Sequence, residues 1–172
     1  MKTLIYMALS ANGCIADHKG DTPWSDGGWK KFAKTVGTYG NIVVGRRTYE
    51  LMEKGGDFDR IGRPYTVVVS RTLKLNPAKN HTVARTPAQA LKLLRKAGYS
   101  KAMVAGGTKL NSSFIEKNLA DEIVLDVEPF LFGGAAIPFL KSRPLMRNLK
   151  LIDAKKYKGG FSLHYKIRKE AP

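Results

Sequence analysis

The chain has 172 residues, of which 43% are hydrophobic and 26% are charged, the balance of a single globular domain covering residues 1–172. That composition excludes a collagen, a coiled coil and a disordered chain, and the single cysteine, Cys14, excludes a disulfide framework and a cysteine-based zinc cluster. The formal net charge of +16 either favours an anionic ligand, such as nucleic acid, an anionic membrane or a phosphorylated small molecule, or reflects only solubility or a general bias towards lysine.

The first predicted elements are a strand and a helix separated by a loop. Residues 3–9 are continuously apolar, which is typical of a strand covered on both faces. Residues 10–13 carry a turn signal. Ser25 or Asp26 can cap a helix whose apolar residues recur at a helical spacing. Those apolar residues are Trp29, Phe32, Ala33 and Val36, and the glycines expected to end the helix are Gly37 and Gly40.

The middle of the chain repeats this alternation. Residues 41–44 predict a second buried strand, and residues 45–48 open a short helix that stops at Gly55 and Gly56. Residues 65–69 are rich in β-branched side chains and predict a third strand. A capping box with proline at the first helical position predicts a helix that starts at residues 86–89.

The last part of the chain contains the remaining strands. Residues 102–105 predict a buried strand, residues 106–108 lead into a helix, and residues 122–127 predict a further strand. Two antiparallel strands, near 149–156 and 161–167, are expected to end the chain. Strands alternating with helices predict an α/β fold with helices on both faces of a mostly parallel sheet, whose ligands gather at the carboxyl ends of strands.

Three expected strand-to-helix corners combine glycine, hydroxyl and basic side chains. Helix amino ends offer free N–H groups, glycine lets a phosphate approach the backbone, and arginine suits phosphate oxygens. One such corner alone is more often a simple turn, but three in one sheet suit a dinucleotide. The corners are Gly45-Arg46-Arg47-Thr48, Ser70-Arg71-Thr72 and Gly106-Gly107-Thr108-Lys109.

Several motifs of other enzyme classes are absent from the sequence. No G-x-G-x-x-G follows a predicted strand, and the chain has no P-loop and no G-x-S-x-G. The three histidines are far apart, so we expect no metal site. No apolar run approaches the ~20 residues that a membrane span needs, so we expect no membrane association and a cytoplasmic location.

Seven segments follow one another along nearly the whole chain: Ser10–Ala16, Pro23-Trp24, Val43–Glu50, Val69–Arg71, Ala105–Thr108, Leu119–Ile123 and Pro129–Gly134. In this order they resemble the dihydrofolate reductase-like superfamily. Within it they most resemble the bacterial bifunctional deaminase-reductase C-terminal domain family, which includes the reductase half of the riboflavin-biosynthesis enzyme. The resemblance implies a three-layer α/β/α fold around a mixed, mainly parallel sheet, NADPH as hydride donor, and homodimers.

The resemblance also implies which residues would hold NADPH. The first and third corners would bind the pyrophosphate, and the serine-arginine pair of the second corner would bind the adenosine 2′-phosphate. Small or apolar residues would pack around the nicotinamide. In that order the residues are Gly45, Arg46, Arg47 and Thr48; Gly106, Gly107, Thr108, Lys109 and Leu110; Ser70 and Arg71; and Ala8, Ile15 and Ala16.

Two positions depart from the resembled patterns and leave the substrate open. Asn12 stands where riboflavin-pathway reductases commonly have aspartate, and Trp29 stands where dihydrofolate reductases carry an acid. We therefore keep two substrate classes, a ribosylaminopyrimidinone phosphate and a dihydropterin.

Five residues are candidates for contact with the substrate. Asp126 lies in an apolar strand, on the face of Val124 and Glu128, and is either a substrate-site acid or a carboxylate in a salt link. Asp26 is a catalytic candidate or a helix cap, and Asn12 is a substrate contact or a turn residue. Trp24 and Trp29 either stack on a planar ring or belong to the core.

The sequence therefore favours an NADPH-dependent reductase of a small nitrogen heterocycle or its sugar-phosphate derivative. Arg71 lies in residues 60–115, which hold eleven Lys or Arg and no Asp or Glu, so we expect NADPH to be preferred over NADH. A nucleic-acid-binding module is the first alternative, and it is disfavoured because the basic residues are not interleaved with aromatic ones. A non-catalytic NADPH-binding protein is the second.

Overall fold

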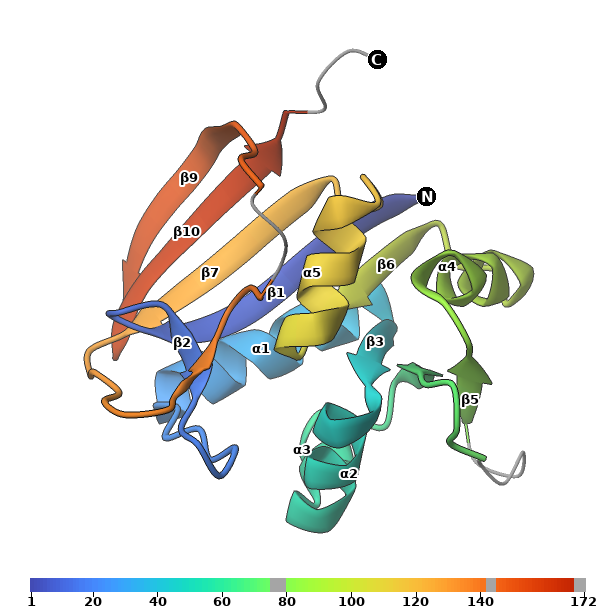
Figure 1. Ribbon diagram of the computed structural model, residues 1–172, viewed down its shortest axis with the longest axis horizontal. Helices are drawn as coiled ribbons and strands as arrows, with labels where there is room; N and C mark the ends of the chain where they lie inside the picture. Colours follow the sequence, from blue (N-terminus) through green and yellow to red (C-terminus); the bar gives the residue numbers. More distant parts are fainter. Residues whose placement is uncertain (75–79, 142–144, 169–172) are drawn as a thin grey trace.

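A twisted eight-stranded mixed sheet forms the centre of the computed structural model, which describes residues 1–74, 80–141 and 145–168 (Figure 1). The strand order is β5-β4-β3-β6-β1-β7-β10-β9. The strands are β1 (Lys2–Ser10), β3 (Asn41–Gly45), β4 (Tyr65–Val69), β5 (His81–Ala84), β6 (Lys101–Val104), β7 (Glu122–Glu128), β9 (Leu149–Tyr157) and β10 (Gly160–Ile167). The helices are α1 (Asp26–Tyr39), α2 (Arg46–Gly55), α3 (Asp57–Arg60), α4 (Pro87–Lys96) and α5 (Thr108–Glu116).

Most neighbours in the sheet are parallel, and the exception is the C-terminal pair. The ladders from β5 through β4, β3, β6 and β1 to β7 are parallel. Strand β10 is antiparallel to β7, and β9 is antiparallel to β10. This arrangement confirms the expected mostly parallel sheet with antiparallel C-terminal strands. A second, two-stranded sheet pairs β2 (Cys14–Ala16) with β8 (Ile137–Pro138).

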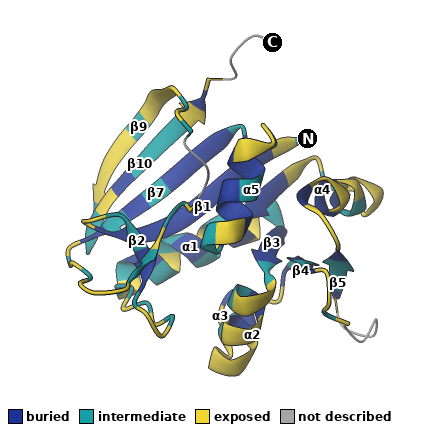
Figure 2. Cartoon of the chain, viewed as in Figure 1, coloured by how far each residue is buried: buried dark blue, intermediate teal, exposed yellow. Residues whose placement is uncertain are grey.

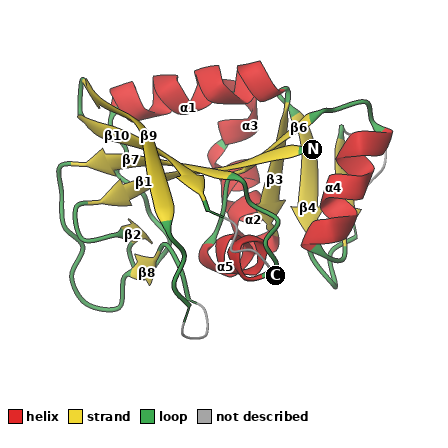
Figure 3. Ribbon diagram, turned by 90° about the horizontal axis from the view of Figure 1, so that it is seen from above, coloured by secondary structure: helices red, strands yellow, loops and turns green. Residues whose placement is uncertain are grey.

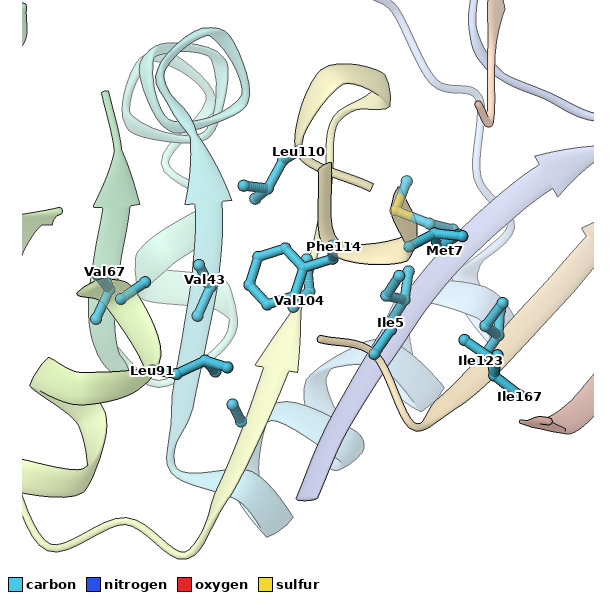
Figure 4. Close-up of a cluster of buried hydrophobic side chains, with 14 of the residues drawn as sticks. Ile5, Met7, Val43, Val67, Leu91, Val104, Leu110, Phe114, Ile123 and Ile167 are labelled. Atoms are coloured by element: carbon cyan, nitrogen blue, oxygen red, sulfur yellow. The ribbon is translucent and has the colours of Figure 1, made fainter. Parts of the chain in front are cut away.

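Helices cover both faces of the sheet, as Figure 3 shows for α1 and α5. Residues of α1, α2 and α3 pack with Tyr6, Ile42 and Val68 in one core. Residues of α4 and α5 pack with Ile5 and Val43 in the other (Figure 4). Alternate residues of β1, β3, β4, β6 and β7 therefore enter opposite cores, which explains the continuous apolar runs of the sequence. Strand β9, at one edge of the sheet, is mostly exposed (Figure 2).

The ends of α1 follow simple chemistry. The Ser25 Oγ atom accepts a hydrogen bond from the backbone N–H of Gly28, so Ser25 is the N-cap. Asp26 is the first residue of the helix, and its side chain is exposed. Gly40 ends the helix in the left-handed conformation, with φ 67°. The expectation that Gly37 helps to end the helix is wrong, because the helix continues through it to Tyr39.

Four short elements were not predicted: β2, β5, β8 and α3. The expected helix start at Ser70-Arg71-Thr72 is also wrong for residues 70–74, where the described chain forms a turn. There the Ser70 Oγ atom accepts hydrogen bonds from the N–H groups of Thr72 and Leu73. This local side-chain bonding competes with a helical start.

Candidate functional site

The three sequence corners meet at one edge of the sheet. Strands β4, β3 and β6 are parallel neighbours, so their carboxyl ends, where the corners lie, are adjacent. The Gly45 N–H donates to the Gly106 carbonyl at 2.8 Å, and the Arg46 Nη1 donates to the Thr72 Oγ1 at 3.0 Å. The structure therefore brings the corners together, as a shared ligand would require.

Two helices that start at this edge lack side-chain caps. Helix α2 starts from Gly45 and helix α5 from Gly107, and neither glycine can supply a capping oxygen. By contrast, Ser25 caps α1 and Thr86 caps α4 through hydrogen bonds from Gly28 and Gln89. The first N–H groups of α2 and α5 thus suit an anion, because helix amino ends carry partial positive charge.

The two glycines at the end of β6, Gly106 and Gly107, lie where an added side chain would press against neighbouring side chains. A Cβ atom on Gly107 would lie 3.2 Å from Thr48 Oγ1 and 3.7 Å from Ile15 Cδ1. A Cβ atom on Gly106, whose φ is +89°, would lie 2.9 Å from Met7 Sδ. The peptide bond between the two glycines is cis. The two glycines therefore pack closely against neighbouring side chains, and their backbone lies beside the Thr48 hydroxyl and the uncapped start of α5, groups whose chemistry is compatible with a phosphate.

Basic side chains surround the same edge. Arg46 bonds Glu50 through Nε at 2.6 Å, and Arg47 donates to the Lys19 carbonyl at 3.0 Å. Arg71 is exposed beside Ser70. Sequence reasoning missed Arg85, whose Nη1 donates to the Ser70 carbonyl at 2.9 Å. Arg85 follows strand β5 directly and lies within the acid-free residues 60–115, and this position is the sequence signal that could have identified it.

The remaining predicted cofactor residues differ in how accessible they are. Thr108 donates its hydroxyl hydrogen to the Pro138 carbonyl, and Lys109 is exposed. Leu110 is buried in the core, and its Cβ atom would lie 3.9 Å from a Cβ atom on Gly45. The predicted nicotinamide contacts Ala8, Ile15 and Ala16 are all buried near the carboxyl end of β1 or in β2.

Asp126 is the centre of a buried polar cluster on the α1 face of the sheet. Its side chain is almost fully buried, its Oδ2 accepts a hydrogen bond from the Tyr6 hydroxyl, and its Oδ1 lies 2.5 Å from Lys31 Nζ. Lys31 also contacts the Ser162 Oγ. Burial, and then the charge of Asp126, raise the pKa of Tyr6 well above its usual value. The salt link weighed for Asp126 is therefore present, and Lys31 is a partner that sequence reasoning missed.

Glu128 connects the end of β7 to the start of α1. Its Oε1 accepts hydrogen bonds from the Ser25 hydroxyl at 3.1 Å and from the Tyr157 hydroxyl at 2.8 Å. Gly28 is necessary here, since a Cβ atom on it would lie 2.4 Å from Glu128 Oε1. Burial and the Glu128 contact raise the pKa of Tyr157. This carboxylate therefore fixes the helix that carries Lys31.

The other substrate candidates make contacts within the protein. The Asn12 Oδ1 accepts from Ser10 Oγ at 2.8 Å, and the Asn12 Nδ2 donates to the Phe132 carbonyl at 2.7 Å. Trp24 and Trp29 pack on each other with ring centroids 5.1 Å apart, and Arg60 lies 4.2 Å above the Trp29 ring. These contacts match the turn and core alternatives more closely than free ligand-binding groups.

A cavity of about 210 Å³ opens beside the Asp126 cluster, and we name it the α1-face cavity. Its lining residues are Tyr6, Lys31, Thr35, Val124, Asp153, Lys155, Ser162 and His164. Across the described residues, no group of three or more His, Cys, Asp or Glu is placed to hold a metal ion. No helix in the described part of the chain is both long and apolar enough to cross a membrane.

Comparison with known proteins gives one family. A protein-family model described as the RibD C-terminal domain matches residues 2–163. The uncharacterized protein YwjB of Bacillus subtilis is 26% identical over 180 residues, covering 95% of this chain and 97% of that protein.

Solved structures show the same fold. A putative riboflavin biosynthesis protein from Shewanella sp. PV-4 superposes with a TM-score of 0.80 at 21% identity, over 98% of this chain and 100% of that chain. RibD of Acinetobacter baumannii gives 0.79 at 16% identity, over 97% of this chain but 58% of that longer chain. The expected three-layer dihydrofolate reductase-like fold is confirmed. Since the family match spans nearly the whole sequence, the chain belongs to the RibD C-terminal domain family.

Proposed function

We propose that the chain is an NADPH-dependent reductase that transfers hydride to a small nitrogen heterocycle or its sugar-phosphate derivative. Membership of the family supports a reductase. A similar structure, 17% identical with a TM-score of 0.73, is that of the Thermotoga maritima diaminohydroxyphosphoribosylaminopyrimidine deaminase and 5-amino-6-(5-phosphoribosylamino)uracil reductase. The match includes 97% of this chain and 56% of the longer Thermotoga chain. We propose the same substrate class, a ribosylaminopyrimidinone phosphate, for this chain. A dihydropterin is the second substrate class.

One observation carries the cofactor part of the proposal. The two glycine-started helices, α2 and α5, begin side by side at the ends of β3 and β6, joined by the Gly45–Gly106 hydrogen bond. Their first N–H groups would hold the pyrophosphate, and Thr48 and Lys109 would add a hydroxyl and a positive charge. One helix start alone is an ordinary feature, but two at neighbouring strand ends would offer N–H donors to both phosphates of a diphosphate.

The strand order extends this assignment to both ends of the cofactor. Ser70, Arg71 and Arg85 lie at the ends of β4 and β5, on one side of the two helix starts. They would hold the 2′-phosphate. On the other side of β6 lies β1, where Ala8 would pack against the reactive ring. When bound, NADPH supplies the hydride, while the chain's residues orient both reactants and exclude water.

Arg71→Ala tests the cofactor assignment. A charge-assisted contact to a phosphate contributes on the order of 1.5–3 kcal/mol, so NADPH affinity should fall roughly 10- to 100-fold while NADH affinity stays the same. Fluorescence titration of each cofactor measures this. Arg95→Ala is the matched control, because Arg95 is an exposed arginine in the last turn of α4. If Arg71→Ala leaves the NADPH to NADH ratio at the Arg95→Ala value, the 2′-phosphate assignment is wrong.

Turnover separates a reductase from a non-catalytic NADPH-binding protein. The expected result is substrate-dependent loss of NADPH absorbance with the pyrimidine or the dihydropterin. NADPH binding without turnover of either ring would contradict the reductase proposal.

We also propose a cytoplasmic homodimer, as the family resemblance implies. Sedimentation velocity at micromolar concentration should give the mass of two chains. A single species with the mass of one chain over the whole concentration range would contradict it.

A further inference from the structure

The hairpin of β9 and β10 has an apolar side that points away from α1. Tyr165 and Leu163 of β10 lie opposite Ile123 and Leu125 of β7, and both of these pack in the core that includes α5. Residues in register across a sheet share a face, so the side chains of β9 and β10 that follow the same alternation form one surface. We call this surface the hairpin face, and its members are Leu149, Leu151, Ala154, Phe161, Leu163 and Tyr165.

The two sides of the hairpin have the reverse of the usual polarity. On a sheet with one open side, apolar side chains normally face the covering layer and polar side chains face water. Here the side towards α1 carries the polar residues that line the α1-face cavity, namely Asp153, Lys155, Ser162 and His164. Figure 1 shows α5 in front of β1, whereas no described helix lies in front of β9 and β10. The hairpin face therefore lacks the layer against which apolar side chains normally pack.

The exposed members of the hairpin face are contiguous. Leu149, Leu151 and Phe161 keep 40%, 51% and 51% of their surface exposed, and Leu163 and Tyr165 are half-buried. Leu151 lies directly opposite Tyr165, so the exposed and half-buried side chains adjoin one another. Single exposed apolar side chains are ordinary, but a contiguous group of them marks an interaction surface.

The charge of the hairpin face indicates which kind of partner it fits. Within the described strands β9 and β10, Lys156 is the one charged side chain that register places on this side, opposite Phe161. A nucleic acid or another polyanion would gain little from such a surface. Two copies of a chain with a net charge of +16 repel each other, so a nearly uncharged face suits contact between them.

The size and shape of the hairpin face also match an identical face. Strand β9 has nine residues. At about 3.3 Å per residue and about 4.8 Å between strands, the face together with the adjoining side of β7 measures roughly 30 Å by 15 Å. Two such faces would bury roughly 900 Å² in total, close to the roughly 1,000 Å² that a specific interface needs. A sheet face packs well on another sheet face with nearly aligned strands, and a second copy supplies one.

The edge of β9 is a poorer contact than the hairpin face. An edge strand has unpaired N–H and C=O groups that can pair with another strand, and lysine on the strand is a common means of preventing this. Strand β9 carries Lys150, Lys155 and Lys156, so pairing of two β9 edges would bring lysines of both copies together. Packing through the hairpin face leaves Lys150 and Lys155 on the α1 side, away from the contact.

We propose that two copies of the chain pack through their hairpin faces, sheet against sheet, around a two-fold axis. The proposal rests on the homodimer proposed above and names the surface that forms it. It does not depend on the reductase activity. A two-fold axis brings the same patch of both copies together, so each copy supplies the apolar layer that the other lacks.

Sedimentation velocity of the full chain over a range of concentrations tests this surface. Leu151→Lys places a charge in the proposed contact, and the two-fold axis repeats it, so the Kd of the dimer should rise at least roughly a hundredfold. Leu51→Lys is the matched control, because Leu51 is a leucine of α2 that is 40% exposed and lies outside the hairpin face. This control should change the Kd less than twofold.

A second variant removes apolar area without adding charge. Leu151→Ser with Phe161→Ser should be a single chain at concentrations where the wild type is a dimer. Both side chains are half exposed on the single chain, so the variant should keep its fold, which circular dichroism checks. This variant separates loss of the contact from repulsion by a new charge.

Salt gives an independent sign. Sodium chloride screens the repulsion between two positively charged chains and does not weaken apolar contact. The Kd of the wild-type dimer should therefore fall between 50 and 500 mM sodium chloride. A Kd that rises with salt would indicate an interface held by ion pairs rather than by the hairpin face.

Two further results would overturn the inference: equal Kd values for the Leu151→Lys and Leu51→Lys proteins, or a folded double serine variant that remains a dimer. Either result keeps the homodimer and moves its contact elsewhere, for example to the edge of β9. A wild type that stays a single chain at every concentration rejects the homodimer and this contact together. The reductase proposal is unaffected by these results, because NADPH titration and turnover test it separately.

Discussion

At the scale of single residues, Tyr49 predicts how stability changes in alkali. Burial and the hydrogen bond to Glu53 raise its pKa to about 12, from the ordinary value of 10. The folded state therefore keeps this proton more strongly than the unfolded state. The contribution of Tyr49 is complete below pH 10 and is lost as the pH rises from 10 towards 12, at up to about 1.4 kcal/mol per pH unit.

Urea denaturation of the wild type and of Tyr49→Phe at pH 9, 10 and 11 measures this loss. Phenylalanine cannot ionise, so the free energy of unfolding of the variant should fall less steeply above pH 10. Parallel pH profiles for the two proteins would show that Tyr49 ionises equally in the folded and unfolded states.

Residue positions within one strand could be predicted, but their distant partners could not. Alternation along β7 places Asp126 with Val124 and Glu128, and all three are buried. Asp126 meets Lys31 and Tyr6 across 95 and 120 residues of sequence. No local pattern encodes such contacts, because they depend on how α1 crosses the assembled sheet. For that reason the sequence identified the acid and missed the lysine beside it.

At the scale of elements, the glycines of α1 predict opposite effects of one substitution. Glycine inside a helix costs roughly 0.5–1 kcal/mol relative to alanine. Gly37 has open space around its Cα hydrogens, so Gly37→Ala should stabilise the protein by about that amount. A Cβ atom on Gly27 would lie 2.0 Å from the Lys158 carbonyl oxygen, so Gly27→Ala should destabilise it by about 1–3 kcal/mol.

Thermal and urea unfolding of the two variants give the signs directly, and each variant is the control for the other. If Gly27→Ala were as stable as Gly37→Ala, the turn between β9 and β10 would not press against α1 as described.

The helix ends illustrate which element boundaries can be predicted. Thr86 caps α4 as its capping box predicts, because that motif carries its own hydrogen-bond partner in sequence. Gly37 was misread as a stop, since an exposed glycine weakens a helix without ending it, and Gly40 provides the left-handed cap instead. Strand β5 was missed because it has only four residues, two of them partly exposed, and gains its stability from pairing with β4.

At the scale of the whole molecule, the uneven charge and the fold coincide. The acid-free residues 60–115 include β4, β6 and the start of α5, which surround the candidate cofactor edge. The acidic residues 116–140 include β7, beyond β1 from that edge. Residues 141–172, which include β9 and β10 at the other end of the sheet, hold ten Lys or Arg and two Asp or Glu, so only part of the +16 charge lies where phosphates are proposed to bind. That part of the charge has a specific consequence.

That consequence is a salt dependence that differs between the two nicotinamide cofactors. Mobile ions screen exposed charges, and the Debye length falls from about 10 Å at 0.1 M to about 3 Å at 1 M. NADPH carries a 2′-phosphate that NADH lacks, and that phosphate would lie among exposed arginines. The Kd of NADPH should therefore rise on the order of tenfold between 50 and 500 mM sodium chloride, more steeply than the Kd of NADH.

Titrations of both cofactors with the wild type and Arg71→Ala measure how steeply each Kd depends on salt, and Arg71→Ala should bring the NADPH slope close to that of NADH. Equal slopes for both cofactors in the wild type would mean that the positive field acts on the pyrophosphate alone, and would remove the charge-based reason for preferring NADPH.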